Sequence, residues 1–142
     1  MPRTARAPMK THVRRRWLQG LAIVTGIVLG VIGLRFGIVP RAAARFFGLD
    51  PPASPAHLHY VVAVRDLWLA ALVIALALLR EWRALALWLG FGAMVCFADA
   101  LIVMDATAWT RSIVFHVASG MFCLGLAIGC WREAVRQSAP QS

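Results

Sequence analysis

Four long apolar stretches, separated by short polar segments, account for most of this chain of 142 residues. A helix needs about 20 mostly apolar residues to cross a bilayer, because each residue adds ~1.5 Å of rise to a ~30 Å hydrocarbon core. Every one of the four stretches is long enough, and they cover residues 17–39, 60–79, 84–104 and 112–131. The pattern therefore predicts an all-α integral membrane protein whose four helices form an antiparallel up-down bundle.

The polar segments complete this plan. Residues 1–16 are basic and aperiodic, which predicts a disordered tail, and residues 132–142 form a polar tail after the single membrane domain of residues 17–131. Pro40 opens the run PRAAARFF in the only long connection, and proline is well tolerated at the first position of a helix. We expect a short helix there, lying in the membrane interface between the first two spans.

Composition agrees with a membrane protein. The hydrophobic fraction is 61% and the charged fraction 15%, whereas soluble domains carry roughly 25% charged residues. The formal charge is +9, but six of the 15 Lys and Arg residues lie in the first 16 positions and most others flank the apolar stretches. Topology and anionic lipid headgroups explain such a distribution. Because no basic surface is interleaved with aromatic residues, we expect no binding of nucleic acid.

The cations between the stretches predict the orientation. Ten fall on the side of the termini: the six N-terminal ones with Arg80, Arg83, Arg132 and Arg136. Three fall on the opposite side: Arg41, Arg45 and Arg111. The positive-inside rule then predicts a multi-pass protein of the bacterial inner membrane with both termini in the cytoplasm.

Each apolar stretch contains at least one ionisable residue. They are Arg35 in the first stretch, Arg65 with Asp66 in the second, Asp99 in the third and His116 in the fourth. With both termini inside, all of them lie about 6–9 Å below the outer end of their helix, at ~1.5 Å per residue. A charge at such depth costs at least a few kcal/mol and persists when it is paired, hydrated or functional. We therefore predict one polar layer in the outer half of the bundle.

Two interpretations of this layer remain open. In the structural one, two arginines balance two aspartates and fix the packing of the helices, as in an accessory membrane subunit. In the other, Arg35 and Arg65 hold the polar head of a lipophilic small molecule beside the aromatic wall of Trp68. Asp99 and His116 are then the candidates for proton transfer. The sequence does not decide whether the protein is an enzyme.

A third interpretation concerns the glycines of the first stretch. Gly26, Gly30, Gly33 and Gly37 recur at spacings of four, three and four, which places them along one face of a helix. Such a stripe allows close approach of a neighbouring helix, so these glycines are candidates for a homodimer contact. Two copies of a four-span chain would suffice for a small transporter.

Metal binding has weak support. The three cysteines lie in apolar stretches without a CxxC pair, which excludes a recognisable zinc site. His57 and His59 have a spacing that suits a metal, but no further ligands accompany them. We expect neither a metal ion nor a cofactor.

Two segments carry a resemblance to a known family. The runs GLRFGIVPRAAARFFGLDPP and VRDLWLAALVIALALLREWRALA, followed by an aspartate in the third stretch and a histidine in the fourth, are the most specific. Over roughly Gly20 to Glu133 the chain resembles a family of small bacterial four-span membrane proteins, catalogued as a domain of unknown function and distantly similar to DoxX-type proteins. The resemblance implies a four-helix membrane fold and implies no particular activity.

Overall fold

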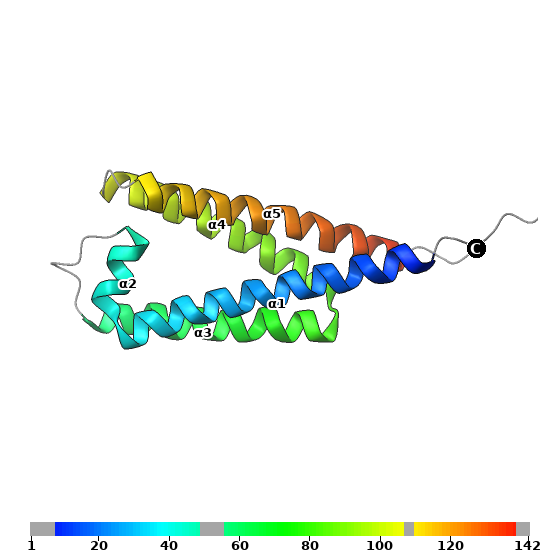
Figure 1. Ribbon diagram of the computed structural model, residues 1–142, viewed down its shortest axis with the longest axis horizontal. Coiled ribbons are helices and arrows are strands. Elements are labelled where there is room, and N and C mark those ends of the chain that lie inside the picture. Colours follow the sequence, from blue (N-terminus) through cyan, green and yellow to red (C-terminus); the bar gives the residue numbers. More distant parts are fainter. Residues whose placement is uncertain (1–7, 49–55, 107–109, 139–142) are drawn as a thin grey trace, which may run out of the picture.

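The computed structural model describes residues 8–48, 56–106 and 110–138. Its elements are α1 (Pro8–Ile38), α2 (Pro40–Phe47), α3 (Ala56–Leu79), α4 (Trp82–Ala106) and α5 (Thr110–Ser138) (Figure 1). Four of these helices, α1, α3, α4 and α5, are long and apolar enough to cross a membrane. The all-α architecture is confirmed, and so is the short helix between the first two spans.

The first and last spans are longer than predicted. Residues 8–16, which were expected to belong to a disordered tail, are helical and form the start of α1. Residues 132–138, expected in the polar tail, continue α5. Contacts between these two extensions explain the difference, because Arg14 of α1 is bonded to Glu133 of α5. Residues 1–7 and 139–142 lie outside the described parts of the chain.

The four long helices are arranged as two antiparallel pairs. α1 packs along α3, and α4 packs along α5, whereas contacts between the pairs are few. Figure 1 shows the pairs converging where α1 begins and α5 ends, which we call the terminus end. At the opposite end the pairs diverge and α2 lies between them, so we call this the α2 end (Figure 1).

The glycine stripe forms the contact between α1 and α3. A Cβ atom on Gly33 would lie 3.0 Å from the carbonyl oxygen of Ala63, and one on Gly26 would lie 2.5 Å from the side chain of Ile74. The other two glycines of the stripe face α3 as well. Within the chain, α3 therefore occupies the face on which the homodimer contact was expected. A dimeric transporter would need another surface.

Two clusters of buried apolar side chains form the core of the molecule. The larger one draws on all four long helices, with Ala22, Val73, Leu89 and Cys130 among its members. The smaller one lies at the α2 end and consists of Phe36, Ala43, Ala44 and Ala63. This smaller cluster contains no residue of α4 or α5. The two pairs are thus joined directly in the larger cluster, whereas the smaller cluster joins α2 to the pair of α1 and α3.

Candidate functional site

The C-terminal turn of α2 is bonded to α5. Ser112 donates a hydrogen bond from Oγ to the carbonyl oxygen of Phe46 at 3.4 Å. The Nε2 atom of His116 lies 3.2 Å from the carbonyl oxygen of Phe47. The last carbonyl groups of a helix have no hydrogen-bond donor within the helix. Ser112 and His116 supply donors to two of these carbonyl groups in α2. The Phe47 ring also packs against His116, with 4.4 Å between the ring centroids.

Gly48 ends α2 in a conformation that favours glycine. Its φ of 102° lies in the left-handed region, which other residues rarely adopt. A Cβ atom there would lie 2.7 Å from the side chain of Val103 and 2.8 Å from that of Ser112. The end of α2 is therefore pressed against α4 and α5, which explains why a residue without a side chain is needed.

Four of the predicted polar residues come together near this contact, from three helices. Arg65 donates a hydrogen bond from Nε to Oδ1 of Asp66 at 3.0 Å, and the Asp66 side chain is buried. Asp99 is half-buried and lies within electrostatic range of Arg65, Asp66 and His116. His116 is buried as well. We call Arg65, Asp66, Asp99 and His116 the polar cluster.

His116 takes part in two sets of contacts. Because the carbonyl oxygen of Phe47 can only accept, Nε2 of His116 must carry the hydrogen in this bond. The imidazole therefore anchors α2 while it lies within electrostatic range of Asp99. His116 was a candidate for proton transfer, and one of its two ring nitrogens is already engaged in the hydrogen bond to α2.

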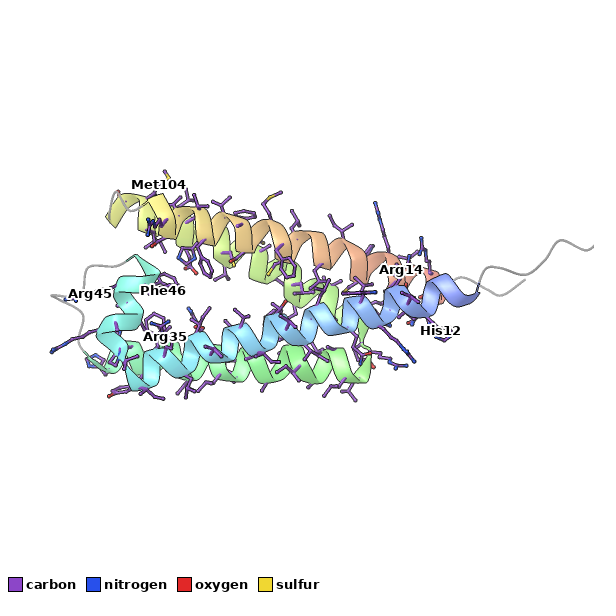
Figure 2. All side chains as sticks on the ribbon, viewed as in Figure 1. His12, Arg14, Arg35, Arg45, Phe46 and Met104 are labelled. Carbon is purple, nitrogen blue, oxygen red and sulfur yellow. The ribbon has the colours of Figure 1, made fainter. Side chains whose placement is uncertain are left out.

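Arg35 lies apart from the acids. Its guanidinium carbon is 5.1 Å from the centroid of the Phe46 ring, a cation–π contact. Figure 2 shows both residues at the α2 end of the molecule. Among the described residues, Arg35 makes no ion pair, and the only ion pair of the predicted layer joins Arg65 to Asp66. The structure thus places Arg35 beside α2 and not with a partner aspartate.

Arg65 also opens onto the outer surface of α3. A shallow groove of about 500 Å³ runs along this helix and is lined by Tyr60, Val61, Val64, Arg65 and Trp68. The Arg65 side chain is 48% exposed, and Trp68 is exposed beside it. We call this depression the α3 groove. It has apolar and aromatic walls and one charged group, whose other side is held by the buried Asp66.

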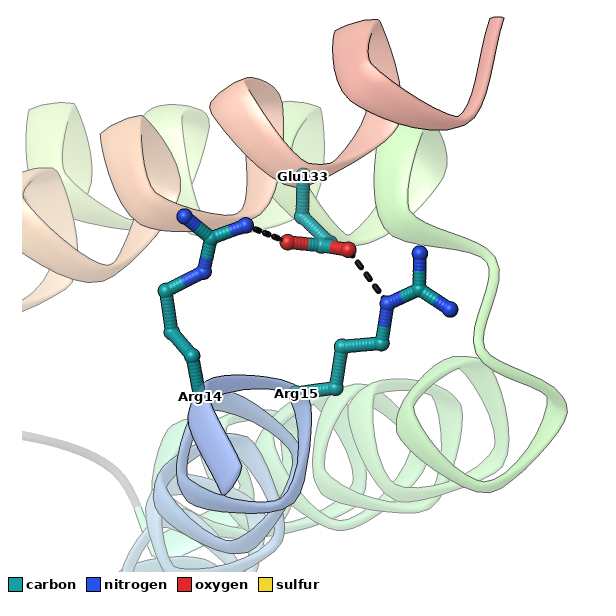
Figure 3. A network of polar contacts seen from close by, with 3 residues as sticks. All are labelled: Arg14, Arg15 and Glu133. Atoms are coloured by element: carbon teal, nitrogen blue, oxygen red, sulfur yellow. Dashed lines mark hydrogen bonds and ion pairs between the residues drawn. The ribbon is translucent and has the colours of Figure 1, made fainter. Parts of the chain in front are cut away.

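The sequence did not reveal a second ionic site at the terminus end (Figure 3). The Glu133 side chain is only 1% exposed and accepts hydrogen bonds from Nη2 of Arg14 and Nε of Arg15. We call these three residues the terminal clamp. One signal could have found it: Glu133 lies three residues after Cys130, so both project from one face of a helix, and Cys130 is buried.

The remaining polar residues that the structure describes show no arrangement suited to a metal. Within residues 8–48, 56–106 and 110–138, no three His, Cys, Asp or Glu side chains are grouped closely enough to bind a metal ion. His59 instead stacks on Phe36, with 6.1 Å between the ring centroids.

The surface of the four long helices indicates which class of protein this is. Their outward positions carry many large apolar side chains, including Phe91, Met94 and Leu101, which is typical of lipid-facing surfaces. Four apolar helices of membrane-spanning length with such a surface define a small multi-pass membrane protein.

Comparison with known proteins places the chain in a particular family. A family model described as "Domain of unknown function (DUF4267)" matches residues 26–131, and the chain belongs to this family. No curated protein and no solved structure matches the chain. The match confirms the predicted membership in a family of unknown function, whereas the similarity to DoxX-type proteins stays a prediction. The matched region contains the polar cluster and the α3 groove, and the three residues of the terminal clamp lie outside it.

Proposed function

We propose that this protein binds a lipophilic small molecule in the α3 groove, with an anionic or carbonyl oxygen of that molecule at Arg65. The observation that supports the proposal is a single guanidinium in a groove that is otherwise apolar and aromatic. Cationic donors beside apolar walls suit a molecule with an oxygen-bearing head and a lipid-like body.

Hydrogen bonding at Arg65 supports the same proposal. The bond to Asp66 uses Nε, and a guanidinium has five N–H groups. Within a bilayer, donors without a partner are costly, because no water is present to accept their hydrogen bonds. An oxygen of a bound molecule at the Nη atoms would satisfy them. The buried Asp66 does not line the groove, and its hydrogen bond to Nε orients the guanidinium.

The proposed location of the groove is the outer leaflet of the bacterial inner membrane, with both termini in the cytoplasm. The support is the loop cation count, ten on the terminus side against three on the α2 side. A reporter that is active only in the cytoplasm, fused after Ser142, should be active. An inactive fusion whose protein is present in the membrane would reverse the orientation.

Native mass spectrometry of protein purified in mild detergent tests the ligand. Arg65→Ala alone is a poor probe, because it also leaves the buried Asp66 without its ion pair. Two better variants leave this pair intact: Trp68→Ala removes a wall, and Val64→Trp fills the groove. We expect wild-type protein to carry a lipophilic compound and both variants to lose it.

Matched controls are available on α5. Trp131→Ala and Val114→Trp make the same two substitutions at exposed positions outside the α3 groove. Both should retain the compound. Wild-type protein repeatedly free of any bound molecule, and not stabilised by lipid extract, would refute the proposal. Equal loss in the variants and their controls would refute the position of the site.

A structural role is the second candidate function, and one observation favours it. Ser112 and His116 bond the end of α2 to α5, so part of the polar layer maintains the connection between the two helix pairs. An accessory subunit would need no more than this. The α3 groove variants distinguish the two roles, because neither substitution touches the α2 contact.

A further inference from the structure

We infer that a second site, on α1 at the terminus end, binds one anionic phospholipid. A groove of about 360 Å³ is lined there by Arg16, Trp17, Gly20, Leu21 and Val24. We call it the α1 groove. It lies near the start of the first span, whereas the α3 groove lies in the first half of α3, near the α2 end (Figure 1). The two sites therefore share no residue and are independent of each other.

The charge of Arg16 is available to a ligand. Three consecutive arginines occupy positions 14–16, and the first two are bonded to Glu133. Arg16 is exposed, and in the described part of the chain it forms no ion pair. Glu133 is the only buried acid among the described residues at this end, and it already has two cationic partners, so the third cation is left for a partner outside the protein. A phosphate diester is complementary to it in charge and hydrogen bonding.

The shape of the groove suits an acyl chain. Gly20 forms its floor, and a Cβ atom there would have no other atom within 4 Å, so the space beside the helix is open. Leu21 and Val24 continue the groove as apolar surface. From Arg16 to Val24 the helix rises about 12 Å, at ~1.5 Å per residue. A lipid chain could therefore lie along α1 with its phosphate at Arg16.

Trp17 supports placement at the membrane interface. Its side chain is 67% exposed and borders the groove next to Arg16. Tryptophan is enriched where the headgroups meet the hydrocarbon, since its ring has an apolar body and a polar N–H group. A free phosphate ion would contact only the charged end of this site. The apolar remainder is explained by a ligand that has both a phosphate and a hydrocarbon chain.

Fluorescence quenching of Trp17 tests the inference on the full chain. Protein is reconstituted into phosphatidylcholine vesicles in which a minor fraction of either phosphatidylglycerol or phosphatidylcholine has brominated chains. Both leaflets have the same composition, so the orientation of the protein does not matter. The Trp17 signal is the difference between each protein and the same protein with Trp17→Phe. The measured quantity is the ratio of quenching by the anionic lipid to quenching by the neutral lipid.

Two variants should lower this ratio, and two matched controls should not. Arg16→Gln should lower it about fivefold, which is the effect of one cation at an anionic lipid surface. Gly20→Leu should lower it by filling the groove without disturbing internal packing. Arg132→Gln removes one exposed cation outside the α1 groove, and Gly125→Leu adds a side chain at an equally open glycine of α5. Both controls should keep the wild-type ratio.

Three results would overturn the inference. A wild-type ratio near one would mean that the groove has no preference for anionic lipid. Equal losses in Arg16→Gln and Arg132→Gln would indicate a diffuse surface potential and no defined site. An unchanged ratio in Gly20→Leu would show that the groove takes no part, whatever the effect of Arg16→Gln.

Discussion

Replacing both Arg14 and Arg15 by glutamine should destabilise the bundle by about 3–5 kcal/mol, the usual cost of leaving a buried charge without its partner. The Glu133 carboxylate is 1% exposed and receives its two ionic hydrogen bonds from these arginines. After the double substitution, Glu133 must remain buried as an unpaired anion, take up a proton, or open the end of α5 to water. Each of these lowers the free energy of unfolding.

The opposite substitution should cost less. The Arg14 and Arg15 side chains are 35% and 39% exposed, so water can hydrate both guanidinium groups when the acid is removed. For Glu133→Gln we therefore expect a loss of about 1–2 kcal/mol, the range of one or two ordinary hydrogen bonds. Combining Glu133→Gln with the double arginine substitution should restore stability relative to the double variant, because no buried charge is then left unpaired.

Titration with sodium dodecyl sulfate in mixed micelles, followed by helical circular dichroism, measures these free energies. Arg16→Gln is the matched control, because it removes a neighbouring cation that is not bonded to Glu133. A double variant no less stable than this control would refute the reasoning about the terminal clamp. So would a triple variant that is less stable than the double one.

Two further predictions concern close contacts between helices. Gly33→Leu should lower the free energy of unfolding by at least about 2 kcal/mol, because its Cβ atom would lie 3.0 Å from the carbonyl oxygen of Ala63 on α3. Gly20→Leu should be nearly neutral in detergent, so equal unfolding midpoints in the two variants would contradict the close approach of α1 and α3. His116→Ala should lower the free energy of unfolding by about 1–2 kcal/mol, because it removes the hydrogen-bond donor to the carbonyl oxygen of Phe47. His116→Gln should recover part of this loss. A fully stable His116→Ala protein would contradict the structural role of this bond.

Local sequence was sufficient for the number and approximate position of the membrane helices. In a bilayer, about 20 consecutive apolar residues can satisfy the hydrogen bonds of their backbone N–H and C=O groups within the segment only as a helix, whatever the rest of the chain does. The short helix was equally local, because Pro40 supplies a favourable first position and the run ends before Gly48. The glycine stripe followed from helical periodicity. The ends of the long helices were not predicted, since α1 and α5 continue past their apolar stretches.

Tertiary structure decided which faces meet. The sequence marked the glycine stripe as a contact face, but only the fold shows that α3, and not a second copy, covers it. The sequence predicted that His116 lies at the depth of the acids, but it did not predict the bond from His116 to Phe47, which lies 69 residues earlier. It gave no partner for Glu133, whose arginines are 118 and 119 residues away.

The reason lies in the solvent. In water, a polar face tells which side of a helix is outside, but lipid is as apolar as the interior of the bundle. Hydrophobicity therefore shows that a helix spans the membrane without showing which of its faces meets a neighbour. Small and ionisable residues mark those faces, as Gly33 and Asp66 do where α1 meets α3. Which helix each of them faces depends on how all the helices pack together.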